Sequence, residues 1–217
     1  MSTVKIVPSI LAKNKTEFKK KVARFAPFFK LLQIDIMDGH FVPNKTYYRL
    51  SEIKRLPNPV NFELHLMVNQ PLRLIKHWID FDKVRSIIVH FEALKSADEL
   101  REIKNLLSGK IRLGLAINPK TEIKNITEYL KFCNFVLMMG VTPGFSGQKI
   151  DRHLYRRITA LNKLKPKIKI SVDGGLNVRN INKIIKLGVS ELNLASYFDQ
   201  PVSLTSLIKQ LRLTITK

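Results

Sequence analysis

The sequence predicts an α/β protein whose fold is a single (β/α)8 barrel over residues 1–217. Two observations support this fold class. Short runs rich in Ile, Val and Leu alternate with helix-like segments about eight times, which is typical of parallel strands joined by helical crossovers. Polar residues also follow most of these runs directly, as expected where successive strands end at one active-site mouth. A doubly wound open sheet is the alternative.

The strands are short apolar segments in which β-branched residues are frequent, and the helices between them repeat apolar residues about every 3.6 positions. The second of the eight strand–helix units has the weakest helical signal, because residues 45–57 offer only a short helical stretch. The helical spacing is clearest over 151–164, 178–187 and 202–213. Strands are expected over 4–11, 31–37, 61–68, 86–91, 112–118, 135–141, 168–173 and 191–196.

Composition and charge limit the classes of function. With 217 residues and 45% hydrophobic composition, the chain can bury one large core. It has neither a recognisable export signal nor a run of about 18 apolar residues, so we expect a soluble, cytoplasmic protein without a membrane partner. The single cysteine, Cys133, excludes an intramolecular disulfide. The net charge of +21 is spread over helical segments, which favours a solvated basic surface over a nucleic-acid interface.

Chemically active side chains occur near the ends of three strands that should converge. Because side chains alternate along a strand, Gln33 shares a face with Asp35, and Glu63 with His65. Together with Asp173, this set of two carboxylates and one imidazole can hold a divalent ion or transfer protons with two bases. Three methionines lie near this set in the sequence: Met37, Met67 and Met139. They are either core residues or an apolar cover that excludes water from the site.

Two glycine-containing loops predict a phosphate site. "TPGFSGQK" at 142–149 follows the sixth strand and precedes a helix, and "DGGLN" at 173–177 follows the seventh. Glycines let backbone N–H groups approach an anion closely, and the following helix adds a favourable partial charge. A phosphorylated substrate is therefore expected.

These segments resemble the ribulose-phosphate 3-epimerase family. "PSILAKN" is similar to the first strand of that family and "DIMDGHFVPN" to the second. "ELHLMV" and "VHFEA" are similar to the third and fourth strands, and "VLMMGVTPGFSGQK" and "VDGGLN" to the sixth and seventh. The resemblance covers nearly the whole chain in the family's order.

The resemblance implies a TIM barrel of the ribulose-phosphate binding type that interconverts D-ribulose 5-phosphate and D-xylulose 5-phosphate. It also implies one divalent ion (Zn, Fe, Mn or Co) on Asp35, His65 and Asp173, and a homo-oligomer is plausible. Asp35 and Asp173 would be the acid and the base on opposite faces of C3. The substrate and phosphate would contact Ser9, Met37, His65, Met67, Met139, Gly144, Phe145, Ser146, Gly147, Gly174, Gly175, Ala195 and Ser196.

The chain departs from the family pattern at three positions, which are Gln33, Ser146 and Ala195. Gln33 stands where the pattern His-x-Asp has a histidine ligand, and an amide oxygen is a weaker ligand than imidazole for zinc or iron. The ion could therefore be weakly held, replaced by Mn²⁺ or Mg²⁺, or absent, with Gln33 hydrogen-bonding the enediolate oxygen directly. Ser146 and Ala195 replace glycines, which would strain any site that needs a positive φ.

Two other functions stay open at this point. A related enzyme would epimerise a ketohexose 6-phosphate, because substrate length is read by pocket shape. A non-catalytic phosphosugar-binding protein with a decayed metal site would explain Gln33.

Overall fold

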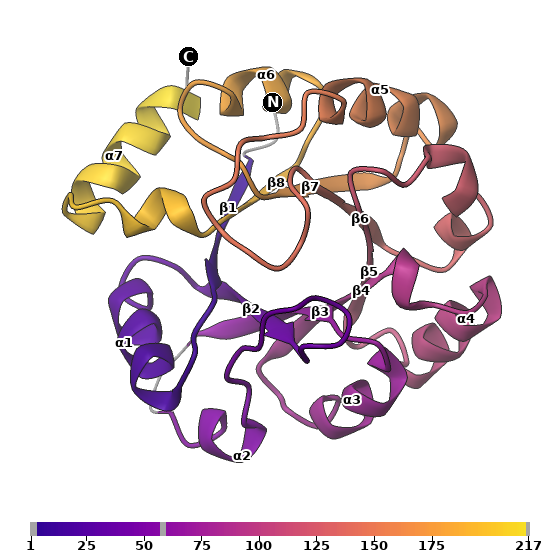
Figure 1. The fold of residues 1–217 in the computed structure, drawn as a ribbon, viewed down its shortest axis with the longest axis horizontal. Helices are drawn as coiled ribbons and strands as arrows, with labels where there is room; N and C mark the ends of the chain where they lie inside the picture. Colours follow the sequence, from indigo (N-terminus) through magenta and orange to yellow (C-terminus); the bar gives the residue numbers. More distant parts are fainter. Residues whose placement is uncertain (1–3, 57–59, 216–217) are drawn as a thin grey trace.

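The computed structural model describes residues 4–56 and 60–215, and in it eight parallel strands close into a barrel (Figure 1). Each strand pairs with its sequence neighbours, and β8 closes the barrel against β1. The (β/α)8 prediction is confirmed, and the open-sheet alternative is wrong. The strands are β1 (Lys5–Ile10), β2 (Leu31–Met37), β3 (Asn61–Met67), β4 (Val84–His90), β5 (Arg112–Ile117), β6 (Phe135–Met139), β7 (Lys169–Asp173) and β8 (Glu191–Leu194).

Helices surround the barrel, and their apolar faces pack on the outward side chains of the strands (Figure 1). The α-helices are α1 (Lys15–Phe25), α2 (Leu50–Ile53), α3 (Pro71–Trp78), α4 (Ala97–Leu106), α5 (Leu154–Leu164), α6 (Ile181–Lys186) and α7 (Leu204–Ile215). The short 3-10 helices are η1 (Phe91–Ala93), η2 (Ile123–Ile126), η3 (Tyr129–Lys131) and η4 (Ser196–Asp199). Among the described helices, none is both long and apolar enough to cross a membrane.

The predicted strands agree with the observed ones to within two residues at each end. The second unit is as short as its sequence indicated, since α2 has four residues. The predicted stretch 45–57 ends at Pro57, which lies outside the described residues. Between β5 and β6 the crossover contains η2 and η3 in place of an α-helix.

The barrel interior has an apolar side and a polar side. On the apolar side, Phe135 fills the space left by Gly114, where an added Cβ would lie 2.5 Å from the Phe135 ring. The other members of this inner cluster are Ile88, Ala116, Leu137 and Met139. The polar side chains of the interior come mainly from β2, β3, β7 and β8, so the functional groups gather over one half of the barrel.

Two buried carboxylates lie below the mouth on the polar side. Glu63 accepts hydrogen bonds from the Ser86 hydroxyl and from Asn193 Nδ2, and Lys5 Nζ lies 2.8 Å from Glu191 Oε2. Burial, followed by the negative charge of Glu191, raises the pKa of Glu63 to about 7. Glu63 therefore holds a proton in the folded protein at pH values where the unfolded chain has lost it.

Replacing Glu63 with Gln should make stability less dependent on pH. In the wild type, folding takes up a proton between the unfolded pKa of 4.5 and the folded pKa of about 7, so stability is full below this window and falls as pH rises through it. The free energy of unfolding of the wild type, measured by urea denaturation, should fall by up to about 3 kcal/mol more than that of Glu63→Gln across the window. Parallel curves for the two proteins would contradict the prediction.

Candidate active site

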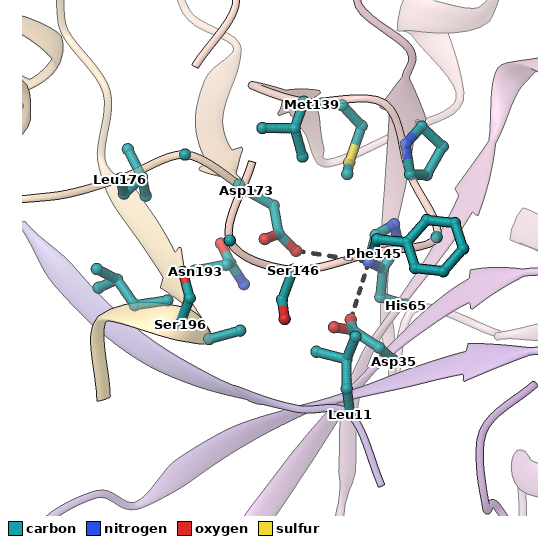
Figure 2. A pocket seen from close by; sticks show the side chains of 18 of the residues that line it. Leu11, Asp35, His65, Met139, Phe145, Ser146, Asp173, Leu176, Asn193 and Ser196 are labelled. Atoms are coloured by element: carbon teal, nitrogen blue, oxygen red, sulfur yellow. Dashed lines mark hydrogen bonds and ion pairs between the residues drawn. The ribbon is translucent and has the colours of Figure 1, made fainter. Parts of the chain in front are cut away.

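Strand register brings the predicted acid and base groups to one level at the carboxyl ends of the strands. Asp35 on β2 pairs with His65 on β3, and Asp173 on β7 pairs with Met139 on β6. Figure 2 shows both carboxylates directed toward the His65 ring. One ligand atom from each of Asp35, His65 and Asp173 lies within 4.8 Å of the others. The sequence prediction that these three converge is confirmed.

His65 is held between the two carboxylates. Its Nδ1 lies 3.0 Å from Asp35 Oδ1 and 3.5 Å from Asp173 Oδ2, and the residue is fully buried. Burial lowers the pKa of His65, but the hydrogen bond to Asp35 and the charges of Asp35 and Asp173 outweigh it and raise the pKa overall. The ring can thus donate a proton to the carboxylates or offer its Nδ1 lone pair to a cation.

Asp173 has an environment suited to a general acid. Burial raises its pKa to about 7, and the charge of Asp35 acts in the same direction, whereas His65 and Gln33 lower it. A carboxyl group with such a pKa keeps its proton through much of the neutral range and can still release it.

Gln33 turns its amide nitrogen toward the carboxylates. Its Nε2 lies 2.6 Å from Asp173 Oδ2, 2.8 Å from Asp35 Oδ1 and 3.0 Å from Ser9 Oγ, so its two protons are shared among three acceptors. Its Oε1 accepts from Asn193 Nδ2 at 2.5 Å. Because acceptors surround one end of this amide and a donor meets the other, its orientation is defined by its neighbours.

A divalent ion fits part of this set. Carboxylate oxygens and an imidazole nitrogen at this spacing are suitable ligands, and Asp35, His65 and Asp173 supply them. The Gln33 NH2 group cannot be a ligand, and it points at the same two carboxylates. Gln33 fits as a fourth ligand only if its amide turns.

His90 on β4 extends the polar network away from the carboxylates. Its Nε2 lies 2.9 Å from His65 Nε2, and its Nδ1 lies 3.3 Å from Glu92 Oε2. Burial lowers the pKa of His90 to about 4 despite the hydrogen bond to Glu92. A neutral His90 that donates from Nδ1 to Glu92 can accept a hydrogen bond at Nε2 from the Nε2–H group of His65. This arrangement leaves His65 Nδ1 facing the carboxylates.

The pocket above the carboxylates is lined by nearly all of the predicted substrate residues. Ser9 is the exception, and its hydroxyl lies 3.0 Å from the Gln33 amide nitrogen. Met37 and Met67 form a small apolar cluster with Val42 at the rim. The loop after β6 carries Phe145, which is 57% exposed and extends over the mouth (Figure 2).

The two glycine loops lie together at this pocket. Gly175 has φ +71°, and a Cβ there would come within 2.7 Å of the Ile150 backbone, so only glycine fits. Ser146 and Ala195, the two residues that replace family glycines, have unstrained backbone conformations. Ala195 has φ −105°, and among the described residues Ser108 is the only non-glycine residue with a positive φ, so Ser146 is not strained either.

Sequence reasoning missed several residues of the site. Asn193 is an inward-facing polar residue in a buried strand, and its alternation with Glu191 in "ELNL" was a usable signal. His90 was visible as a polar strand end, but its contact with His65 depends on strand packing. Four other lining residues lie within the segments that resemble the family but were not predicted as site residues: Leu11, Val141, Pro143 and Leu176. Leu194 and Tyr197 line the pocket from outside those segments.

Comparison with known proteins agrees with this geometry. The model of the ribulose-phosphate 3 epimerase family matches residues 5–198. The chain belongs to the ribulose-phosphate 3-epimerase family. A ribulose-phosphate 3-epimerase of Chlamydia pneumoniae is 33% identical over 214 residues, which are 93% of this chain and 90% of that protein. One from Aquifex aeolicus (strain VF5) is 34% identical over 76% of each chain.

More distant structures share only the fold. A mutant tryptophan synthase alpha-subunit from Pyrococcus furiosus superposes with a TM-score of 0.72 at 13% identity, and the match covers 100% of both chains. This likeness supports the barrel and carries no information about the reaction.

The ring of His90 should stay neutral from pH 8 to pH 5, with its proton on Nδ1. Burial lowers its pKa to about 4, so protonation requires more acid than an ordinary histidine needs. The measurement is ¹⁵N NMR of the imidazole rings in chelator-treated protein, with the His90 signals assigned from a His90→Gln variant. A midpoint near the ordinary value of 6.5 would contradict the prediction.

Proposed function

We propose that this chain interconverts D-ribulose 5-phosphate and D-xylulose 5-phosphate by proton transfer at C3. The observation that carries the proposal is the meeting of Asp35 and Asp173, from β2 and β7, beneath a pocket bordered by two glycine loops. The names of the family's members favour the pentose phosphate over a ketohexose 6-phosphate. The retained pair of aspartates favours catalysis over a non-catalytic phosphosugar-binding role.

In the proposed reaction, one aspartate removes the C3 proton next to the C2 ketone, and the other returns a proton from the opposite face. The raised pKa of Asp173 suits the protonated partner, and Asp35 is then the base. The reverse reaction starts with the two protonation states exchanged. The enediolate formed between the two steps carries negative charge on oxygen, which must be stabilised within the site.

Asp35, His65 and Asp173 would hold the family's divalent ion. When bound, such an ion supplies Lewis-acid stabilisation of that developing charge. The choice among Zn, Fe, Mn and Co is part of the proposal to be tested by reconstitution. His90 would accept a hydrogen bond from the Nε2–H group of His65, which would keep the Nδ1 lone pair of His65 available to bind the ion.

The remaining pocket residues would position the substrate. Backbone N–H groups near Gly144, Gly147, Gly174, Gly175 and Ser196 would bind the phosphate. Met37, Met67 and Met139 would cover the reacting carbons and exclude water. We further propose a cytoplasmic homo-oligomer of one-domain chains, in which the net charge of +21 attracts the anionic ketose phosphate and not nucleic acid.

Asp35→Asn and Asp173→Asn should each lower kcat by about 10²- to 10⁴-fold, because an amide cannot take or return the C3 proton. The assay follows formation of D-xylulose 5-phosphate and uptake of solvent deuterium at C3, after reconstitution with Zn²⁺, Fe²⁺, Mn²⁺, Co²⁺ or Mg²⁺. Asp98→Asn on the exposed surface of α4 is the matched control. A wild type without turnover under every condition would overturn the function, and active variants would overturn the assigned roles.

Gly175→Ala should raise KM for the ketose phosphate about tenfold, the effect of losing about 1.4 kcal/mol of binding, with a smaller change in kcat. The added Cβ pushes against Ile150 and displaces the phosphate loop. Gly109→Ala is a matched control, because Gly109 has the same φ of +71° and open space around an added Cβ. Equal kinetics for the two variants would argue against a phosphate role for this loop.

A further inference from the structure

We propose that Asn193 positions the Gln33 amide and that this amide pair opposes the binding of a divalent ion by the carboxylates. The inference rests on the site of the proposed function, but it concerns ion binding and not turnover. It assigns a role to Asn193 and gives Gln33 a role opposite to that of the ligand it replaces.

The first step is the orientation of Gln33. Its NH2 group lies within hydrogen-bonding distance of Asp35 and Asp173, the two carboxylates that a cation would use. An amide that donates to both carboxylates stabilises their negative charge, although the amide itself is neutral. An ion that binds these oxygens therefore competes with the Gln33 donors for their lone pairs.

The second step is the contact that keeps Gln33 from turning. Asn193 Nδ2 donates to Gln33 Oε1 at 2.5 Å and to Glu63 Oε1 at 3.0 Å. If Gln33 alone turned to offer its oxygen to an ion, its NH2 group would face the NH2 group of Asn193. Two donors would then meet in a buried site, and Asn193 Nδ2 would lose one of its two acceptors and keep only Glu63 Oε1.

The third step is the contact that fixes Asn193 in turn. Turning Asn193 as well would break its bond to Glu63 Oε1 and would require Glu63 to donate a proton to the Asn193 oxygen in return, so Gln33 cannot turn unless both neighbours rearrange. Asn193 is buried, and among the described residues its Oδ1 has no hydrogen-bond partner. An orientation that leaves this oxygen unsatisfied is maintained because the two bonds made by Nδ2 outweigh the loss. Glu63 thus fixes the orientation of the Asn193 amide, and Asn193 fixes the orientation of the Gln33 amide.

This arrangement separates two views of Gln33. If Gln33 is a weak metal ligand, removing its amide should weaken ion binding. If the amide opposes the ion, removing it should strengthen binding, although a possible ligand is lost. Gln33→Leu therefore distinguishes the two, and Asn193→Leu tests the positioning role because it removes the donor that holds Gln33 Oε1.

The experiment measures Co²⁺ binding to chelator-stripped protein by its visible absorption and by calorimetry. Gln33→Leu and Asn193→Leu should each bind Co²⁺ at least tenfold more tightly than the wild type. Ser171→Ala is the matched control in the same interior layer, because Ser171 contacts Glu191 and not the amide pair, and its affinity should equal that of the wild type. Gln33→Leu affinity equal to or weaker than that of the wild type would overturn the proposal.

A measurement on the wild type keeps the test independent of variant folding. The side-chain NH2 signals of Gln33 and Asn193 should shift together as Zn²⁺ is added, because one amide cannot turn without the other. A shift of the Gln33 signals alone would overturn the positioning role of Asn193. Neither result depends on epimerase turnover, so failure of this inference and failure of the proposed function are distinguishable.

Discussion

The structure depends on how two buried carboxylates, Asp35 and Asp173, obtain hydrogen-bond donors. Both lie at the mouth of a barrel where water has little access, so unpaired negative charges there would be costly. The Gln33 NH2 group supplies donors, and the His65 ring adds one whenever Nδ1 carries a proton. These donors are in turn fixed by His90 on one side and by Asn193 on the other.

This requirement explains why the barrel interior is divided. Apolar side chains from β4 and β6 fill one side against the small residues Gly114 and Ala116 of β5, and they need no partners. The other side is a connected set of polar groups that runs from Glu63 up to the carboxylates at the mouth. A polar set of this kind is stable only when nearly every member is satisfied, and it then holds the reacting groups in one geometry. The site is therefore supported by the polar half of the barrel and closed by the apolar methionines at its rim.

Much of the site could be predicted from local sequence. Period-two alternation placed Gln33 with Asp35 and Glu63 with His65, because a strand directs every second side chain to the same face. Asn193 could have been found by the same argument, since an amide inside a buried strand is uncommon. The crossover between β5 and β6 was less predictable, because 3-10 turns carry little periodicity in the sequence.

The sequence by itself determined the eight strands, the face of each residue and the identity of the chemical groups, because these follow from short-range periodicity and side-chain chemistry. Only the tertiary structure decided how those groups are oriented. Which end of the Gln33 amide meets the carboxylates depends on Ser9, Asp173 and Asn193, which come from three other strands. Hydrogen-bond direction is set by all neighbours at once, and the neighbours are known only when the barrel closes.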